Sequence, residues 1–247
     1  MSERTRSGSE RGTRIARFLA AAGVASRRAA EVMIAGGRVQ LNGAPVAHPA
    51  TFVQPGDVVA VDGKAVAQPA RTRLWRYHKP PGLVTTHRDP AGRPTVFASL
   101  PAGMPRVISI GRLDLASEGL LLLTNDGALA RRLELPSTGW KRRYRARVHG
   151  TVDERALAAL SRGVTIGGIT YGPIEAALDA RKSTNAWLSV SLSEGKNREV
   201  RRVLAHLGLA VTRLIRIAYG PFQLGQLPRG AVQEVAPKVL REQLGPK

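Results

Sequence analysis

The acidic residue best placed for chemistry is Asp114, in the segment GRLDLASEGLLLLTNDG (residues 111–127). It precedes a run of four leucines that closes on an Asn-Asp-Gly turn signal. An acid at such a position is either a turn residue or a reactive carboxylate. Arg112 and Ser117 share this approach to the leucine run, where loop residues can face a cleft. A shielded carboxylate stays ionised only beside a cation or hydrogen-bond donors, so another segment must supply a partner.

The segment NREVRRVLAHLG (residues 197–208) offers that cation from a predicted helix. Its apolar stripe consists of Val200, Val203, Leu204 and Leu207. On the helical wheel Arg198 and Arg202 point nearly opposite to the stripe, whereas Arg201 falls on its flank. A flank arginine can reach into a cleft, and its planar donor fork suits a carboxylate. Helix phase therefore favours Arg201 over Arg198 as the partner of Asp114; the alternative is a surface arginine.

A third segment, KRRYRARV (residues 141–148), alternates as a strand does. One face would carry four cations, Lys141, Arg143, Arg145 and Arg147. Tyr144 would share the other face with apolar residues and Arg142. Tyr144 is then either a core residue or a cleft residue that stacks on a base, while the cationic face binds phosphates.

Composition restricts the classes of partner and of chemistry. The chain has 38 Lys and Arg against 18 Asp and Glu, a formal net charge of +20, which favours nucleic acid as the partner. The chain has no cysteine, which excludes disulfides, thiolate catalysis and Cys-based zinc sites. Its five histidines show no metal-ligand spacing, and no Walker-type loop or GxGxxG is present, so we expect no metal or nucleotide cofactor. No apolar run is long enough to span a membrane.

The elements that must position these residues fall into two predicted domains. Residues 1–12 are predicted to be a disordered basic tail. In residues 13–61 two short helices, the second capped by Ser26, precede strand-like runs with Asn-Gly and Asp-Gly turns. Residues 62–72 are predicted to be a linker because they are small, polar and interrupted by Pro69.

Residues 73–247 are predicted to form a larger α+β domain on a largely antiparallel sheet. Its strand-like runs are LWRYHK, LVTT, RYRARV, AWLSVSL and TRLIRI. Its predicted helices lie at 126–134, 153–162 and 197–207.

The first domain also carries a cluster of cations outside its apolar face. They are Arg14, Arg17, Arg27, Arg28 and Arg38. These residues form either a solvated surface or a phosphate-binding face made by two helix edges. The helix–SRR–helix–GxVxxNG layout resembles the ribosomal protein S4-like RNA-binding domain, which implies the second reading.

GRLD, KxxY and NREVRR occur in the order and approximate spacing of the bacterial ribosomal RNA pseudouridine synthases, which this chain resembles over roughly residues 14–235. The details are most similar to the type B large-subunit enzymes of the RsuA-like branch, including HKPPGLVTT and RLIRIAYGPFQLGQLPRG. The resemblance implies that Asp114 is the catalytic carboxylate and that Arg201 pairs with it. It also implies that Tyr144 stacks on the base and accepts a proton, and that Val200 packs beside the base. Arg112 would also bind the substrate, and Lys141 and Arg143 would bind RNA.

The expected activity is therefore a cofactor-free isomerisation of a uridine in ribosomal RNA, within an assembly intermediate, by a cytoplasmic monomer. A non-catalytic RNA-binding assembly factor would explain the charge and the first domain equally well, but not the placement of Asp114, Tyr144 and Arg201. A DNA-binding regulator is less compatible, because the chain shows no recognition helix with a dimer seam.

Overall fold

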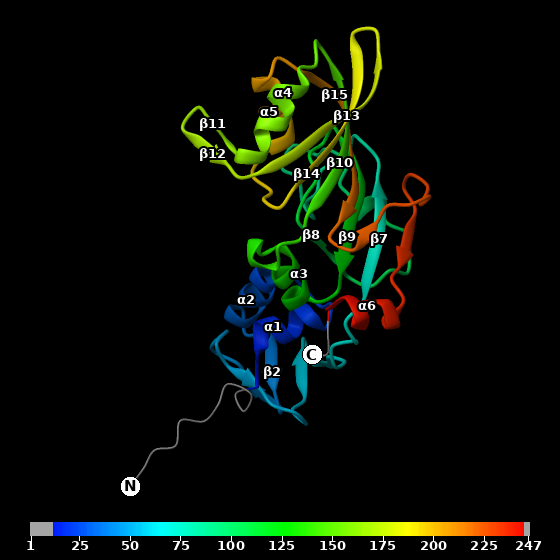
Figure 1. Cartoon of the computed structure of the whole chain (residues 1–247). Helices are drawn as coiled ribbons and strands as arrows, with labels where there is room; N and C mark the ends of the chain where they lie inside the picture. The colour runs from blue at the N-terminus through cyan, green and yellow to red at the C-terminus, as the bar shows by residue number, and fades with distance from the viewer. Residues whose placement is uncertain (1–11, 245–247) are drawn as a thin grey trace. The chain divides into compact units, whose positions relative to one another are not determined.

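The computed structural model describes residues 12–244, which form two compact units that divide between Thr72 and Arg73. Figure 1 shows the course of the chain through both units. The predicted tail at residues 1–12 lies outside the described residues except for Gly12. Each unit has its own hydrophobic core and is described separately below.

The first unit packs two helices, α1 (Ile15–Ala21) and α2 (Arg27–Ala35), against small sheets. Its strands are β1 (Thr13–Arg14), β2 (Val39–Leu41), β3 (Ala44–Pro45), β4 (Phe52–Val53), β5 (Val59–Val61) and β6 (Lys64–Ala65). The Ser26 side chain accepts a hydrogen bond from the Ala29 amide, so the predicted helix cap is confirmed. Asn42 has a φ of 52° and Gly43 one of 82°, as the predicted tight turn requires.

The segment predicted as a linker begins inside this unit. Strand β6 pairs with β5 through Val61 and Lys64, so the prediction of a linker at 62–72 is wrong for its first residues. The Asp62–Gly63 turn closes this hairpin, and its positive φ values of 49° and 75° suit Asp and Gly. The composition of residues 62–72 concealed a strand that is only two residues long.

The second unit is built on a mixed sheet of nine strands, ordered β13-β14-β10-β15-β9-β7-β17, with β16 on β15 and β8 on β9. Its strands are β7 (Leu74–Lys79), β8 (Ile108–Ile110), β9 (Ser117–Thr124), β10 (Arg142–His149), β13 (Ile174–Lys182), β14 (Asn185–Leu192), β15 (Ala210–Tyr219), β16 (Phe222–Gln223) and β17 (Val232–Glu234). Within this sheet only β15 and β9 pair in parallel. The predicted α+β fold with a largely antiparallel sheet is confirmed.

The leucine run of β9 is buried on both faces of the sheet. Leu121 and Leu123 belong to one hydrophobic core, and Leu120 and Leu122 belong to the core on the opposite face. This position explains the unbroken apolar run, because a strand covered on both faces has no polar side. Asp114 lies in the loop that leads into the most deeply buried strand of the unit. The C-terminal end of that loop is therefore anchored to a rigid element.

The helices cover different faces of the sheet. Helices α4 (Glu154–Ala159) and α5 (Glu199–His206) contribute to the core that contains Tyr144, whereas α3 (Gly127–Glu134) and α6 (Pro237–Leu244) contribute to the other core. A hairpin of β11 (Val164–Ile166) and β12 (Ile169–Tyr171) and the 3-10 turns Phe97–Ser99, Pro136–Thr138 and Leu160–Arg162 complete the unit. The helices predicted at 126–134 and 153–162 are confirmed.

One predicted strand is wrong. LVTT (83–86) is a bent loop in which only Val84 forms a bridge, to Thr95. It follows the Pro80–Gly82 turn, and its Thr85 side chain contacts the loop that carries Asp114. Its β-branched residues suit extended backbone, but here the side chain of Thr85 bonds Leu113.

Candidate active site

A cleft of about 600 Å³ brings the three candidate segments together in the second unit. Its walls come from the loop before β9, from β10 and β15, and from the residues leading into α5. Among the residues that line it are Arg112, Asp114, Tyr144, Val200, Leu214 and Arg216. Four of the predicted site residues, Arg112, Asp114, Tyr144 and Val200, therefore lie around one space, although 88 positions separate the first from the last.

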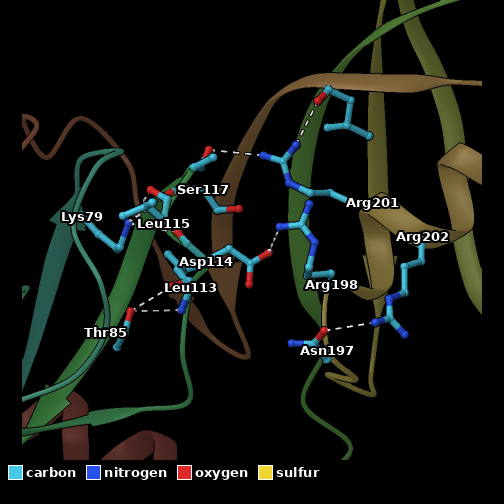
Figure 2. Close-up of polar contacts among 12 residues, drawn as sticks. Lys79, Thr85, Leu113, Asp114, Leu115, Ser117, Asn197, Arg198, Arg201 and Arg202 are labelled. Carbon is cyan, nitrogen blue, oxygen red and sulfur yellow. Dashed lines mark hydrogen bonds and ion pairs between the residues drawn. The ribbon is translucent and has the colours of Figure 1, made fainter. Parts of the chain in front are cut away.

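The carboxylate of Asp114 faces Arg198 across this cleft (Figure 2). Its Oδ2 lies 3.5 Å from Nη1 of Arg198, and its side chain is 31% exposed. The Asp114 carbonyl accepts a hydrogen bond from the Ser117 amide at 3.0 Å, so the residue also closes a turn. The turn reading and the reactive reading of Asp114 are thus compatible, because one uses its backbone and the other its side chain.

The predicted pairing of Asp114 with Arg201 is wrong in this structure. Helix α5 begins at Glu199, and Arg198 precedes it with left-handed backbone, φ 52° and ψ 31°. The helical wheel placed Arg198 opposite the apolar stripe because it extended the helix to residue 197. The left-handed turn instead directs the Arg198 guanidinium toward Asp114 (Figure 2).

Arg201 instead anchors the backbone of the Asp114 loop. Its Nη2 donates to the Ala116 carbonyl at 3.2 Å, and its Nη1 donates to the Val211 carbonyl at 2.9 Å. Burial lowers the pKa of Arg201, the positive charge of Arg198 adds to that effect, and the negative charge of Asp114 opposes it. Arg201 is therefore within electrostatic reach of Asp114 and holds the loop from the α5 side.

Lys79 holds the same loop from the other side, and sequence reasoning missed it. The residue is fully buried at the end of β7, and its Nζ lies 3.1 Å from the Asp114 carbonyl and 2.8 Å from that of Ser117. The carbonyls of Pro80 and Leu115 lie 3.1 and 3.5 Å from the same Nζ. Lys79 thus pins the backbone that carries the carboxylate.

The turn after Lys79 completes this support. The amide of Gly82 donates to the Leu115 carbonyl at 2.8 Å, and Oγ1 of Thr85 donates to the Leu113 carbonyl at 2.9 Å. All five carbonyl oxygens of residues 113–117 therefore accept a hydrogen bond. The HKPPGLVTT segment is explained by this role: it supplies donors that immobilise the Asp114 loop.

We expect the rate of the chemical step to fall as the pH rises through about 8. Burial lowers the pKa of Lys79 to about 8, against the opposing charges of Asp114 and Glu118. Below that pH the ammonium has three N–H donors, and above it the neutral amine has two, so the loop loosens. The protonated fraction of a group with this pKa falls about tenfold between pH 7 and 9, so the single-turnover rate should fall by about the same factor. RNA affinity measured in parallel should change less, and a flat rate profile over this range would refute the role of Lys79.

Tyr144 lies where the strand alternation predicts. It is 9% exposed, belongs to the hydrophobic core with Ala146 and Val148, and also lines the cleft. Tyr144 is therefore both a core residue and a lining residue of the cleft, and its stacking on a base stays a prediction. Val200, at the start of α5, adds an apolar wall to the same space. An aromatic ring and an aliphatic wall beside a carboxylate suit a flat, partly polar ligand such as a nucleobase.

Arg216 is a second buried cation at the cleft that sequence reasoning missed. It is 2% exposed, and its Nε donates to the Leu120 carbonyl at 2.7 Å. Within residues 12–244 its Nη2 has no hydrogen-bond partner. Gly119 explains how Arg216 fits: it has a φ of 106°, and a Cβ there would lie 2.3 Å from the Arg216 carbonyl oxygen. Neither signal was recognisable in the sequence, because both arise from the β9–β15 pairing.

The predicted RNA-binding cations differ in their exposure and in whether they already have a partner within the protein. In the first unit Arg14, Arg17, Arg27 and Arg28 are exposed, whereas Arg38 forms a bidentate ion pair with Asp62. In the second unit the side chains of β10 that alternate with Tyr144 are exposed, as predicted. Several cations there already have partners: Lys141 pairs with Glu175, Arg145 with Asp179, and Arg143 bonds Gln223. The four-cation face is therefore weaker than its sequence suggests.

Two further properties concern the part of the chain that the structure describes. Over residues 12–244, no three His, Cys, Asp or Glu side chains converge as metal ligands would. Over the same range, no helix has the length and apolar character that crossing a bilayer requires.

Both units match known families. The sequence model of the RNA pseudouridylate synthase family matches residues 73–206, and that of the S4 domain matches residues 13–59. A protein of Rickettsia prowazekii described as an uncharacterized RNA pseudouridine synthase is 46% identical over 94% of this chain and 97% of its own length. A ribosomal large subunit pseudouridine synthase B of Salmonella typhi is 41% identical over 90% of this chain and 79% of its own length.

A solved structure has the same overall fold. The crystal structure of a pseudouridylate synthase aligns with a TM-score of 0.65 and 25% sequence identity. The alignment covers 94% of this chain and all of the other. The likeness therefore extends over both units and includes the region of the cleft.

Proposed function

We propose that this chain, which belongs to the RNA pseudouridylate synthase family, converts a uridine of large-subunit ribosomal RNA to pseudouridine. The observation that carries the proposal is the shared cleft of Asp114 and Tyr144, with Asp114 held beside Arg198. The choice of large-subunit RNA rests on relatives such as the Salmonella typhi protein, whose name includes that substrate. Members of this family are isomerases.

The reaction moves one glycosidic bond and one proton. The bond between uracil N1 and ribose C1′ breaks, the base turns, and a bond forms between C5 and C1′. The proton on C5 leaves and N1 gains a proton, so that no redox partner or water is consumed. In our proposal Asp114 attacks the sugar, attacks the base or removes a sugar proton, and Tyr144 stacks on the base and accepts the C5 proton.

The cleft suits a base that has left its stack. Extruding a nucleotide costs a few kcal/mol, and stacking on an aromatic ring returns roughly 1–3 kcal/mol per base. Tyr144 and Val200 offer that apolar contact, and Arg112 lies at the exposed edge of the cleft, where a phosphate can reach it. This balance favours a uridine in an exposed or still unfolded rRNA segment, so we propose an assembly intermediate as the natural substrate.

Mapping of pseudouridine in protein-free large-subunit rRNA incubated with the purified chain tests this function. We expect modification at one or a few uridines. The alternative, a non-catalytic RNA-binding assembly factor acting in the cytoplasm, predicts binding without modification. We propose a cytoplasmic monomer for the enzyme, which sedimentation with and without RNA would check.

Exposed arginines of the first unit should contribute to RNA affinity but not to the chemical step. Arg27 and Arg28 lie on the first turn of α2, where backbone amides also favour an anion. Replacing both with glutamine should weaken rRNA binding and flatten the slope of log affinity against log salt by about 1.4–1.8. A matched control pair, Lys238→Gln with Arg241→Gln on α6, removes the same charge from exposed positions of the second unit. Equal slopes for the two pairs would show that α2 does not touch RNA.

A further inference from the structure

A second cleft in the same unit combines cations with an aromatic ring and shares no residue with the cleft of Asp114. It has a volume of about 560 Å³, within the range of small-molecule pockets. Its walls are the β13–β14 hairpin, β10 and β15, and its side chains include Arg147, Arg181, Lys182, Arg213 and Trp187. Four of these five are positively charged.

Strand register explains why these side chains meet. Arg147 pairs directly with Trp187 on β14 and with Arg213 on β15, so the three stand in one row on one face of the sheet. Because side chains alternate along β10, this face is opposite to the one that carries Ala146 and Val148. Helices α4 and α5 contribute to the core on that other face, which leaves the row accessible.

The positive charges of the second cleft are only partly compensated by carboxylates. Arg213 forms an ion pair with the buried Glu118, whereas the described residues provide no carboxylate within 4.0 Å of Arg147 or Lys182. Arg147 and Arg213 are directly opposite each other on neighbouring strands, an arrangement of like charges that disfavours strand pairing. A bound anion would relieve that repulsion.

The aromatic ring of Trp187 distinguishes this cleft from an ordinary solvated basic surface. The ring is half-buried, and the guanidinium of Arg145 lies 4.8 Å from its centroid, which holds it in place. Beside it stand the unpaired cations Arg147 and Lys182. A π surface next to phosphate-binding cations has the chemistry of a single-stranded nucleic acid site.

We propose that this second cleft binds a nucleotide of the substrate RNA other than the target uridine. The phosphate lies between Arg147 and Lys182, and the base packs against Trp187. The proposal rests on the proposed function in taking RNA as the substrate. The two clefts then hold the RNA at two separate points, so that a long RNA is oriented before its target uridine enters the cleft of Asp114.

The test compares the full chain with Arg147→Gln/Lys182→Gln and with the control pair Lys238→Gln/Arg241→Gln. Figure 1 shows α6, which carries the control pair, at the opposite end of the same unit from the β13–β14 hairpin. The probe is protein-free large-subunit rRNA, titrated over a range of salt. We expect the first pair to flatten the salt slope by about 1.4–1.8 more than the control pair. With protein below saturation, its pseudouridine formation should fall together with its RNA affinity.

Trp187→Leu provides an independent test, because it keeps apolar volume and removes the π surface. We expect it to weaken rRNA binding by roughly 5- to 150-fold with an unchanged salt slope. Wild-type affinity in this variant, or a slope for the Arg147/Lys182 pair equal to that of the control, would overturn the proposal and leave an acidic protein segment as the occupant. Absence of pseudouridine with the wild-type chain would refute the proposed function instead, because the binding measurements need no turnover.

Discussion

Replacing Asp114 with asparagine should reduce pseudouridine formation at least about a thousandfold, because a group that acts directly on the reacting atoms contributes about this much or more. Asparagine has almost the same shape and can still accept a hydrogen bond from Arg198, whose Nη1 lies 3.5 Å from Oδ2 of Asp114. The change therefore removes the charge and the nucleophilic or basic oxygen but leaves the loop in place. The carbonyl bonds of residues 113–117 do not involve the altered group.

The measurement is single-turnover pseudouridine formation with the protein in excess over rRNA. RNA affinity should stay near that of the wild type, since many cations share the binding and Asp114 is one acid among them. Asp126→Asn is a matched control: Asp126 also lies near β9, but its side chain caps α3 through the Ala128 and Leu129 amides. Substantial turnover by Asp114→Asn would exclude Asp114 as the catalytic carboxylate.

The sequence predicted the elements that bury an apolar surface with a regular period. The leucine run of β9, the alternation in β10 and the apolar stripe of α5 each carry their own signal, and all three are confirmed. The phase of each element predicted that Tyr144 and Val200 lie on apolar faces, but their place at the cleft came from the resemblance. Asp114 required the resemblance, because an acid before a strand is also an ordinary turn residue.

The buried cations could not be predicted, because their surroundings are made by segments far apart in the chain. Lys79 ends a strand, which usually means an exposed lysine, yet it is fully buried. It is buried because carbonyls 35 to 38 positions later face its ammonium group. Arg216 sits under Gly119 in a parallel pairing that local patterns do not reveal.

The prediction that Arg201 rather than Arg198 pairs with Asp114 was wrong because of the local backbone conformation. A helical wheel assumes helical backbone at each residue, but Arg198 has a φ of 52° and stands outside α5. A non-glycine residue with such a φ is uncommon, so no helix pattern anticipates it. The structure consequently gives the two arginines separate tasks: Arg198 meets the carboxylate of Asp114, and Arg201 meets the loop backbone.

Because Arg198 and Arg201 have separate tasks, replacing each with lysine should have a different effect on the rate. Arg201→Lys should slow single-turnover pseudouridine formation by roughly 10- to 150-fold, the cost of one lost charge-assisted hydrogen bond. Arg201 donates from Nη1 to Val211 and from Nη2 to Ala116, and one ammonium group on a shorter stem cannot reproduce that fork. Arg198→Lys should cost only a few-fold, because a single charge 3.5 Å from Asp114 can be supplied by an ammonium group.

Arg202→Lys is the matched control for both variants. Arg202 is exposed, and its side chain donates a hydrogen bond to Oδ1 of Asn197 at 3.4 Å, so its lysine variant should retain the wild-type rate. Arg198→Met, which removes the charge, should then lose far more activity than Arg198→Lys, whereas charge alone should not rescue position 201. Saturating protein keeps weaker RNA binding from mimicking slower chemistry. A larger loss in Arg198→Lys than in Arg201→Lys would mean that Asp114 needs the planar fork of Arg198, and that Arg201 does not position the loop.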